Sequence, residues 1–192
     1  KIDFQGTKDN PIVLNSISEK WKGIYVYGSK EKSYMKNINI SNLDELNDGI
    51  LNLTGGINFY KSNIEIDNLI LKNSFGEDSI NIIKSIFLIN NLKIENSYSD
   101  AIDLDYSDGR MVNSFFKNIK GDAVDISGSN VELDNIEIKN VNDKGISIGE
   151  NTSANINNID IFNARIGILC TRIFKNRFSR RVKLVPLSHE WN

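Results

Sequence analysis

The chain has 192 residues, of which 40% are hydrophobic and 25% charged, and its formal net charge is −2. This length and composition are typical of one folded domain and exclude a disordered chain. One cysteine excludes an intrachain disulfide bond, and no apolar run approaches the ~20 residues that a membrane-spanning helix needs.

The net charge hides an uneven distribution. Residues 1–169 contain 17 Lys/Arg and 24 Asp/Glu, whereas residues 170–192 contain six Lys/Arg and one acidic residue. The body is therefore acidic and the C-terminal segment basic, which argues against a nucleic acid as a partner of the body. No signal peptide is visible at Lys1, and we expect the native N-terminus to lie upstream.

The N-terminal segment predicts an irregular start to the fold. A turn signal, Gly6-Thr-Lys-Asp-Asn-Pro11, precedes the apolar run Ile12-Val-Leu14. The alternating segment Trp21-Lys-Gly-Ile-Tyr-Val-Tyr27 then predicts a β-strand.

Two short phrases recur along the rest of the chain and keep step with each other. The first is N-Ψ-x-Ψ-x-N, where Ψ is usually apolar, and its last five copies start 22 or 23 residues apart. Its six copies begin at Asn37, Asn68, Asn91, Asn113, Asn135 and Asn158. The second is a charged or apolar residue, a small residue and an alternating apolar pair. It occurs at Asp48-Gly-Ile50, Asp78-Ser-Ile-Asn-Ile82, Asp100-Ala-Ile-Asp-Leu104, Asp122-Ala-Val-Asp-Ile126, Lys144-Gly-Ile-Ser-Ile148 and Ile166-Gly-Ile168.

A fixed period of this length indicates a solenoid in which each repeat is one coil. Two helices need more residues than one such coil offers, and the alternation of apolar and polar residues has the period of a β-strand. Leucine-rich repeats share the period but need a fixed lattice of leucines that is absent here. We therefore predict an all-β parallel β-helix of ~22 residues per coil and about seven coils.

Stacking of equivalent residues defines the predicted core. Coils in such a fold lie ~4.8 Å apart, so equivalent apolar residues form internal ladders. The asparagines at the ends of the first phrase are expected at turns, bonded to the main chain and from coil to coil. The two predicted core ladders are Ile80, Ile102, Val124, Ile146 and Ile168, and Ile82, Leu104, Ile126, Ile148 and Cys170.

Two segments interrupt the pattern. Extra residues between Asp48 and Asn68, around Gly55–Tyr60, predict a loop that leaves the first sheet. Beyond Cys170 neither phrase occurs. We therefore expect a β-helix domain over residues 1–169 and a basic tail over 170–192, either a cap on the open end or unrelated sequence.

The outward residues of the first sheet carry the most suggestive chemistry. Alternation predicts two neighbouring columns on this sheet. One contains Tyr25, Leu51, Asn81, Asp103, Asp125 and Ser147, and the other Tyr27, Leu53, Ile83, Asp105, Ser127 and Gly149. Asp78, Asp100 and Asp122 are expected at the entrance of the strands.

Five carboxyl groups are thus predicted within two adjacent coils: Asp100, Asp103, Asp105, Asp122 and Asp125. Crowded carboxylates raise a pKa or bind a cation, and Asp103, Asp105 and Asp125 are the candidate ligands for Ca²⁺. No other cofactor is predicted. The competing interpretation is structural, because Asp is a common turn residue and acidic faces keep a solenoid soluble.

The same face could act on or bind a carbohydrate. Asp103 and Asp125 are candidates for a catalytic acid/base pair, as in glycoside hydrolysis. Asp100, Asp105 and Asp122 would then be binding residues. Aromatic residues can stack on sugar rings or pack under a loop, and the candidates are Tyr25, Tyr27, Phe59, Tyr60 and Tyr106.

With both phrases in place, the chain resembles the right-handed parallel β-helix repeat proteins of the pectate-lyase-like superfamily over about residues 4–169. The segments that carry the resemblance are Gly6-Thr-Lys-Asp-Asn-Pro-Ile12, Trp21-Lys-Gly-Ile24, Gly121-Asp-Ala-Val-Asp-Ile-Ser127 and Asp143-Lys-Gly-Ile-Ser-Ile-Gly-Glu150. They are similar to segments of bacterial β-helix proteins. The resemblance implies the right-handed fold, which hosts lyases, hydrolases, epimerases, adhesins and proteins without known chemistry.

The chemical residues of that superfamily are mostly missing. Its galacturonan hydrolases have a Gly-His-Gly turn and an Arg-x-Lys strand, and neither occurs here; the one histidine is His189, in the tail. Elimination in the pectate-lyase-like enzymes uses an arginine base. Arg110, which follows the turn Ser107-Asp-Gly109, is the candidate for that role, with a solvated turn residue as the alternative.

Two functional hypotheses follow. The first is a structural or binding domain of an exported or cell-surface bacterial protein, with a polysaccharide or a protein as its partner. The second is a carbohydrate-active enzyme that acts on an acidic polysaccharide through Asp103, Asp125 and Arg110.

Overall fold

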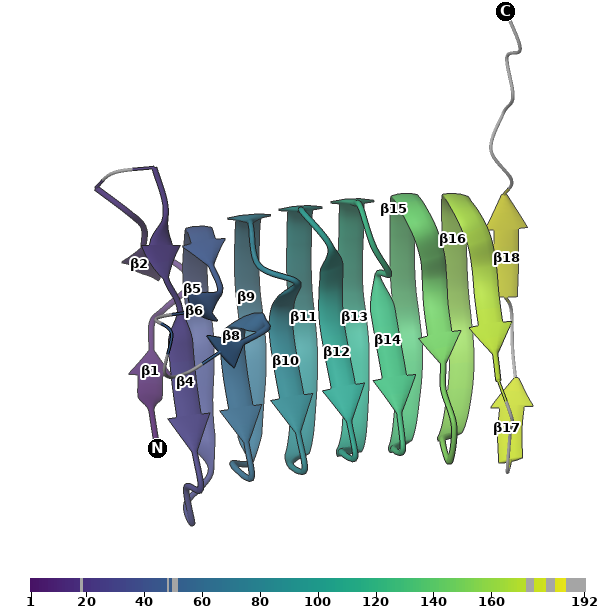
Figure 1. The fold of residues 1–192 in the computed structure, drawn as a ribbon, viewed down its shortest axis with the longest axis horizontal. Helices are drawn as coiled ribbons and strands as arrows, with labels where there is room; N and C mark the ends of the chain where they lie inside the picture. Colours follow the sequence, from purple (N-terminus) through teal and green to yellow (C-terminus); the bar gives the residue numbers. More distant parts are fainter. Residues whose placement is uncertain (18, 48, 50–51, 172–174, 179–181, 186–192) are drawn as a thin grey trace, which may run out of the picture.

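The computed structural model describes residues 1–17, 19–47, 49, 52–171, 175–178 and 182–185, which form β-strands and no helix (Figure 1). Asp48, Ile50, Leu51 and His189, named in the sequence analysis, lie outside the described residues. The strands are β1 (Asp3–Gln5), β2 (Ile12–Leu14), β3 (Trp21–Lys22), β4 (Ile24–Tyr27), β5 (Ser33–Asp44), β6 (Leu46–Asn47), β7 (Asn52–Leu53), β8 (Gly55–Tyr60), β9 (Ile64–Ser74), β10 (Asp78–Ile83), β11 (Ile86–Ser97), β12 (Asp100–Asp105), β13 (Asp108–Ile119), β14 (Val124–Ser127), β15 (Asn130–Ile148), β16 (Ser153–Cys170), β17 (Lys175–Phe178) and β18 (Val182–Val185).

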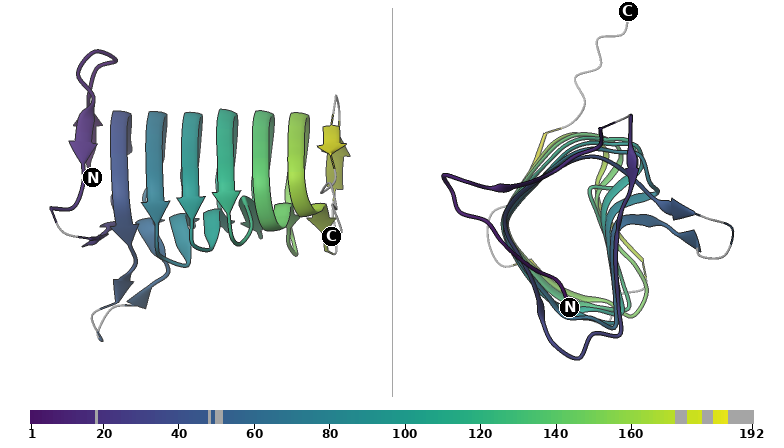
Figure 2. Two further views of the ribbon diagram at one scale, coloured as in Figure 1. Left: turned by 90° about the horizontal axis from the view of Figure 1, so that it is seen from above. Right: turned by 90° about the vertical axis from the view of Figure 1, so that its left-hand side faces the viewer.

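The chain winds into a rod of about seven coils, which confirms the predicted solenoid. Seen along its axis, the rod has a three-sided outline (Figure 2). Strands β4, β8, β10, β12 and β14, with the ends of β15 and β16, form the first face, which corresponds to the predicted first sheet. The long strands β5, β9, β11, β13, β15 and β16 bend at an asparagine and supply the second and third faces.

Pairing between coils is parallel throughout the first face, and its register confirms both core ladders. Ile80 pairs with Ile102, Ile102 with Val124, and the ladder continues through Ile146 to Ile168. The second ladder runs from Ile82 to Cys170 in the same way. Ile102 and Val124 have no exposed surface, and at this end of the rod Ile168 and Cys170 are partly buried. Stacked aliphatic side chains of this kind each contribute roughly 1.5–3 kcal/mol when fully buried.

The asparagines of the first phrase make the corners. All twelve adopt a positive φ, between 49° and 63°, which Asn tolerates better than other residues with a side chain. At the third corner, where the chain passes from the third face to the first, their amides form a ladder. Each Nδ2 donates to the Oδ1 of the preceding coil over 2.9–3.2 Å, from Asn163 through Asn140, Asn118, Asn96, Asn73 and Asn42 to Asn15. The predicted structural role of these residues is confirmed.

A second ladder, of serines, was not predicted. At the first corner, between the first and second faces, the buried hydroxyls of Ser62, Ser85, Ser107 and Ser129 each accept a hydrogen bond from a main-chain N–H of the preceding coil. These bonds satisfy main-chain donors that the turn would otherwise leave buried without a partner.

The predicted loop at Gly55–Tyr60 is wrong. This segment is strand β8, which pairs with β4 and β10 on the first face. The extra residues instead form the antiparallel hairpin β6–β7 just before it, which leaves the rod at the third corner (Figure 2). Leu53 therefore belongs to the hairpin and not to a column of the first face.

Parallel pairing continues into the segment that was expected to be a tail. Strand β17 pairs with Ser153–Ile156, and β18 with Ile159–Phe162, at spacings of 22 and 23 residues. The described part of the chain contains no helix long and apolar enough to cross a membrane.

Candidate functional site

The outer side of the first face carries two columns whose residues change from coil to coil. The register gives Tyr25, Asn58, Asn81, Asp103, Asp125 and Ser147 in one column, and Tyr27, Tyr60, Ile83, Asp105 and Ser127 in the other. Because β8 supplies the missing coil, Asn58 and Tyr60 stand where Leu51 and Leu53 were expected. Each column passes from an aromatic N-terminal part to an acidic central part.

The aromatic part is a cluster of tyrosines. The rings of Tyr27 and Tyr60 are stacked, with centroids 5.5 Å apart and planes inclined by 15°, and Tyr25 lies 6.2 Å from Tyr27. The side chain of Tyr27 is 63% exposed. Phe59, which was expected to belong to this group, is fully buried and extends the core ladder between Val26 and Ile82. The cluster therefore exposes tyrosine rings, each with a polar hydroxyl group, to solvent next to Asn58.

Lysines and a further tyrosine surround this cluster at the first corner. The ammonium groups of Lys61 and Lys84 lie 5.4 and 6.0 Å from the centroid of Tyr60. Lys84 also lies 5.8 Å from the ring of Tyr106, which is 62% exposed. Tyr106 covers Gly128 of the next coil, where a Cβ would meet the ring at 2.6 Å.

The backbone of this corner is strained in the coils that carry these residues. The equivalent corner positions that the structure describes, from Gly28 to Asn151, each hold a left-handed residue, and at Gly28, Gly128 and Asn151 that residue suits the conformation. Lys61, Lys84 and Tyr106 adopt φ values of 49°, 51° and 49°. A residue of their type adopts this conformation at a cost of roughly 1–2 kcal/mol. Such strain concentrates where a side chain has a use other than stability.

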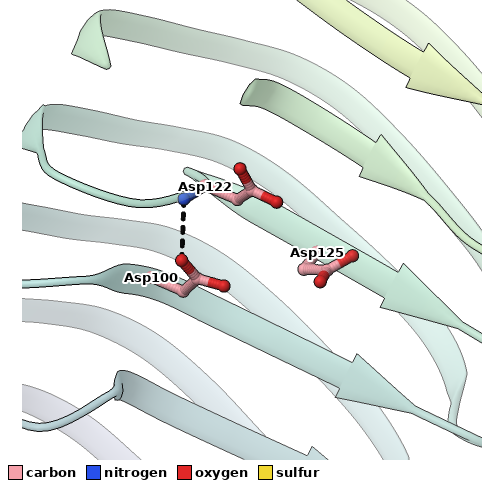
Figure 3. A group of neighbouring side chains, drawn as sticks. All are labelled: Asp100, Asp122 and Asp125. Atoms are coloured by element: carbon pink, nitrogen blue, oxygen red, sulfur yellow. Dashed lines mark hydrogen bonds between the residues drawn. The ribbon is translucent and has the colours of Figure 1, made fainter. Parts of the chain in front are cut away.

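The acidic part brings three carboxyl groups together (Figure 3). Asp100, Asp122 and Asp125 each offer an oxygen within 4.8 Å of the others. The Oδ1 of Asp100 accepts a hydrogen bond of 2.8 Å from the main-chain N–H of Asp122, and Oδ1 of Asp122 accepts one of 2.9 Å from the N–H of Lys144. These bonds repeat from coil to coil, so Asp100 and Asp122 have a structural role at the strand entrance.

Lys144 partly neutralises this trio. Its Nζ lies 2.9 Å from Oδ1 of Asp122 and 2.7 Å from Oδ2 of Asp143. Burial lowers the pKa of Lys144, but its hydrogen bonds to Asp143 and Asp122 outweigh this effect and leave the pKa raised. Asp122 is therefore already paired with a cation, and a metal ion at the trio would compete with Lys144.

The carboxyl groups away from Lys144 are more strongly perturbed. Burial raises the pKa of Asp103 to about 8, and the charges of Asp105, Asp78 and Asp125 act in the same direction. Burial also raises the pKa values of Asp78 and Asp100 to about 6 and that of Asp105 above its usual range. At neutral pH the face therefore holds a protonated Asp103, which can donate a hydrogen bond.

Asn81 connects this region to the base of the hairpin. Its Nδ2 donates to Oδ2 of Asp78 at 3.0 Å and to the hydroxyl of Thr54 at 2.9 Å. Its Oδ1 is buried and has no hydrogen-bond partner among the described residues. Asn81 lies in the predicted column, but its burial beside Thr54 depends on the hairpin β6–β7, which the sequence does not predict.

The structure brings the predicted residues together only in part. Asp103 and Asp125 are neighbours in register, whereas the three closest carboxyl groups are those of Asp100, Asp122 and Asp125. A divalent cation would therefore find its closest group of oxygen ligands in the described chain at Asp100, Asp122 and Asp125. The predicted set was Asp103, Asp105 and Asp125, and only Asp125 belongs to both.

Arg110 does not join this group. It lies on β13, on the second face, in register with Leu88 and Glu132. Its guanidinium forms ion pairs with Glu132 at 3.3 Å and with Asp134 at 3.6 Å.

Comparison with known proteins agrees with the coil geometry. A family model described as a right handed beta helix region matches residues 78–182, more than half of the chain. The chain belongs to the right-handed β-helix family. No curated protein and no solved structure matches it. The family match covers the acidic part of the first face, and the tyrosine cluster lies before it.

Proposed function

We propose that the first face is a carbohydrate-binding surface of an exported or cell-surface bacterial protein. One observation carries the proposal: the exposed Tyr25 and Tyr27, the latter stacked on Tyr60, begin the same two columns that lead into a cluster of carboxyl groups. Ring faces bind the apolar sides of sugars, and carboxyl groups accept hydrogen bonds from sugar hydroxyls. The strained backbone at Lys61, Lys84 and Tyr106 supports this assignment, because backbone strain of this kind clusters at ligand-binding sites.

The direction of the columns suggests how a glycan would lie. Adjacent coils are ~4.8 Å apart, so a linear glycan along the rod axis would contact successive coils with successive sugar units. Tyr27 and Tyr60 would stack on sugars at one end, and Asp103 and Asp105 would bind hydroxyls at the other. A protonated Asp103 lowers the repulsion that an acidic sugar would meet on this face.

Calorimetric titration with polygalacturonate and with a neutral β-glucan, each with and without Ca²⁺, tests the proposal. Tyr27→Ala should weaken binding of the glycan that binds, by roughly tenfold or more, because aromatic anchors dominate such contacts. Tyr98→Ala is the matched control, since Tyr98 is 61% exposed on the third corner, away from the first face. Binding that survives Tyr27→Ala, or the absence of binding to either glycan, would refute the proposal.

A second candidate is a carbohydrate-active enzyme, and the raised pKa of Asp103 favours it. A carboxylic acid that stays protonated at neutral pH suits a general acid. Asp125, its neighbour in register, would be the base or nucleophile, since the ~4.8 Å strand spacing is close to the ~5–5.5 Å separation found in retaining glycosidases. Arg110 has no part in this version because it is ion-paired on the second face.

Incubation with polygalacturonate separates the two candidates, with products measured by reducing-end and unsaturated-product assays. Turnover that Asp103→Asn abolishes would favour the enzyme. Binding without turnover, with or without Ca²⁺, would favour the binding surface.

A further inference from the structure

A groove runs along the third corner, away from the first-face columns. One hollow of about 430 Å³ is lined by residues between Asn73 and Asn142, and a second of about 240 Å³ is lined by residues between Asn140 and Arg165. The two share Asn140 and Asn142, so they form one continuous channel along the rod axis. Phe75, Tyr98, Lys120, Asn142 and Arg165 follow one another along its rim at steps of 22 or 23 residues.

The residues of the rim change from aromatic at one end of the groove to basic toward the other. Phe75 and Tyr98, which are 42% and 61% exposed, stand at one end of the groove. Lys120 and Arg165 stand toward the other end, and Lys120 forms no ion pair with any described residue. The guanidinium group of Arg165 forms an ion pair with Asp143 at 3.7 Å, and because its side chain is 72% exposed it can also contact a ligand.

The floor of the groove is the asparagine ladder. Each ladder amide uses one N–H and one acceptor site to bond its neighbours, so one donor and one acceptor remain per amide. Asn96, Asn118 and Asn140 are exposed. Their free groups form a row of amide donors and acceptors that can hydrogen bond to the polar groups of a ligand.

The charge of the residues that line the groove favours an acidic ligand. Residues 1–169 contain more acidic than basic residues, yet no Asp or Glu lines either part of the groove. An acidic ligand would therefore meet cations and neutral amides here, whereas most of the acidic body would repel it.

We propose that this groove binds an extended acidic peptide segment of a partner protein. The rim from Phe75 to Arg165 spans four coil steps, or about 19 Å, which an extended chain covers with about six residues. Apolar side chains of the segment pack against Phe75 and Tyr98, and its carboxylates pair with Lys120 and Arg165.

A lysine lies against each aromatic ring of the groove. The ammonium group of Lys20 lies 5.5 Å from the ring centroid of Phe75, and that of Lys120 lies 4.7 Å from that of Tyr98. These contacts are cation–π pairs that hold the lysines beside the rings. On the first face, Lys61 and Lys84 lie against Tyr60 in the same way, whereas Tyr27 stacks on Tyr60 and has no such cation among the described residues.

Selection from a displayed library of random linear peptides on the folded chain tests this proposal. We expect enriched sequences with apolar residues at one end and acidic residues at the other. Synthetic copies, measured by fluorescence anisotropy, should bind Lys120→Glu and Tyr98→Ala at least roughly tenfold more weakly than the wild type. Melting curves of these surface variants establish that they are folded.

Tyr27→Ala is the control that separates this groove from the proposed glycan surface, and it should leave peptide binding unchanged. Selection without an acidic consensus, or peptides that bind Lys120→Glu as tightly as the wild type, would overturn the proposal. Displacement of the peptide by oligogalacturonate from the same groove would also overturn it, since the site would then recognise an acidic glycan.

Discussion

The third corner and the first face are built on the same coil spacing, but they use it differently. At the third corner the described coils repeat one residue type, and the asparagines from Asn42 to Asn163 bond to one another in a single ladder. On the outer side of the first face the same stacking places tyrosine, asparagine, aspartate and serine in turn. A ladder of identical residues stabilises the rod, and a column whose residues change carries local chemistry.

The largest expected effect concerns the repeated interior. Val124 has no exposed surface and stacks between Ile102 and Ile146. Val124→Asp would bury an unpaired carboxylate and should lower the free energy of unfolding by several kcal/mol, measured by chemical denaturation. Val13→Asp is the matched control, because Val13 is 65% exposed and should tolerate the charge. An unchanged denaturation midpoint for Val124→Asp would disprove the stacked core.

The next prediction separates two contributions of a corner asparagine to stability: its side-chain hydrogen bonds and its left-handed backbone conformation. Asn96 has a φ of 63°, donates its amide to Asn73 and accepts one from Asn118, both at 3.0 Å. Asn96→Ala should cost roughly 1–3 kcal/mol, because it loses both bonds and places a Cβ in the left-handed region. Asn96→Gly loses the same bonds but relieves the backbone, so it should cost less. Equal losses of stability would mean that the conformation of this corner contributes nothing.

The sequence predicted the repeated parts of the molecule well. A stacked core needs the same kind of residue at the same place in every coil, so Ile102 and Val124 could be aligned from spacing alone. The corners were equally visible because only a few residue types favour a positive φ. The serine ladder carries a similar period, but serines also occur at many other positions, so the pattern was weak.

The parts that vary were harder to predict. Asp48-Gly matched the second phrase, whereas the true strand β8 begins with Gly55-Gly and lacks the acidic residue. The signal that could have identified it is Ile57-Asn58-Phe59, 23 residues before Ile80. Within the candidate site, the sequence predicted the carboxyl column. It did not predict Lys144 as the partner of Asp122, because that pairing depends on side-chain orientation at the strand entrance.

The third prediction concerns Asp103, in a column whose residues vary, and its effect on the pH dependence of stability. The folded state raises the pKa of Asp103 to about 8, whereas an unfolded chain has a value of about 3.9. Between these values the folded chain holds a proton that the unfolded chain has lost, so stability should fall as the pH rises from ~4 to ~8. Asp103→Asn should flatten this decline, by roughly 1–3 kcal/mol in denaturation curves across that range.

Ser147→Asn is the control for this measurement. It places the same side chain in the same column without removing a carboxyl group, so the decline with pH should remain. A decline that is equally steep in Asp103→Asn would show that Asp103 is not the group that titrates.

The smallest effect should be a gain in stability at the expense of binding. Lys84 has a φ of 51° and places its ammonium group beside Tyr60 and Tyr106. Lys84→Gly removes the backbone strain and should raise the free energy of unfolding by about 0.5–1 kcal/mol, while it weakens glycan binding at the tyrosine cluster. Asn151→Gly, at the equivalent corner position, should change neither quantity much, because Asn already suits this conformation. If Lys84→Gly left binding intact, the strain at this corner would have no connection with the first face and would no longer support the tyrosine cluster as a binding site.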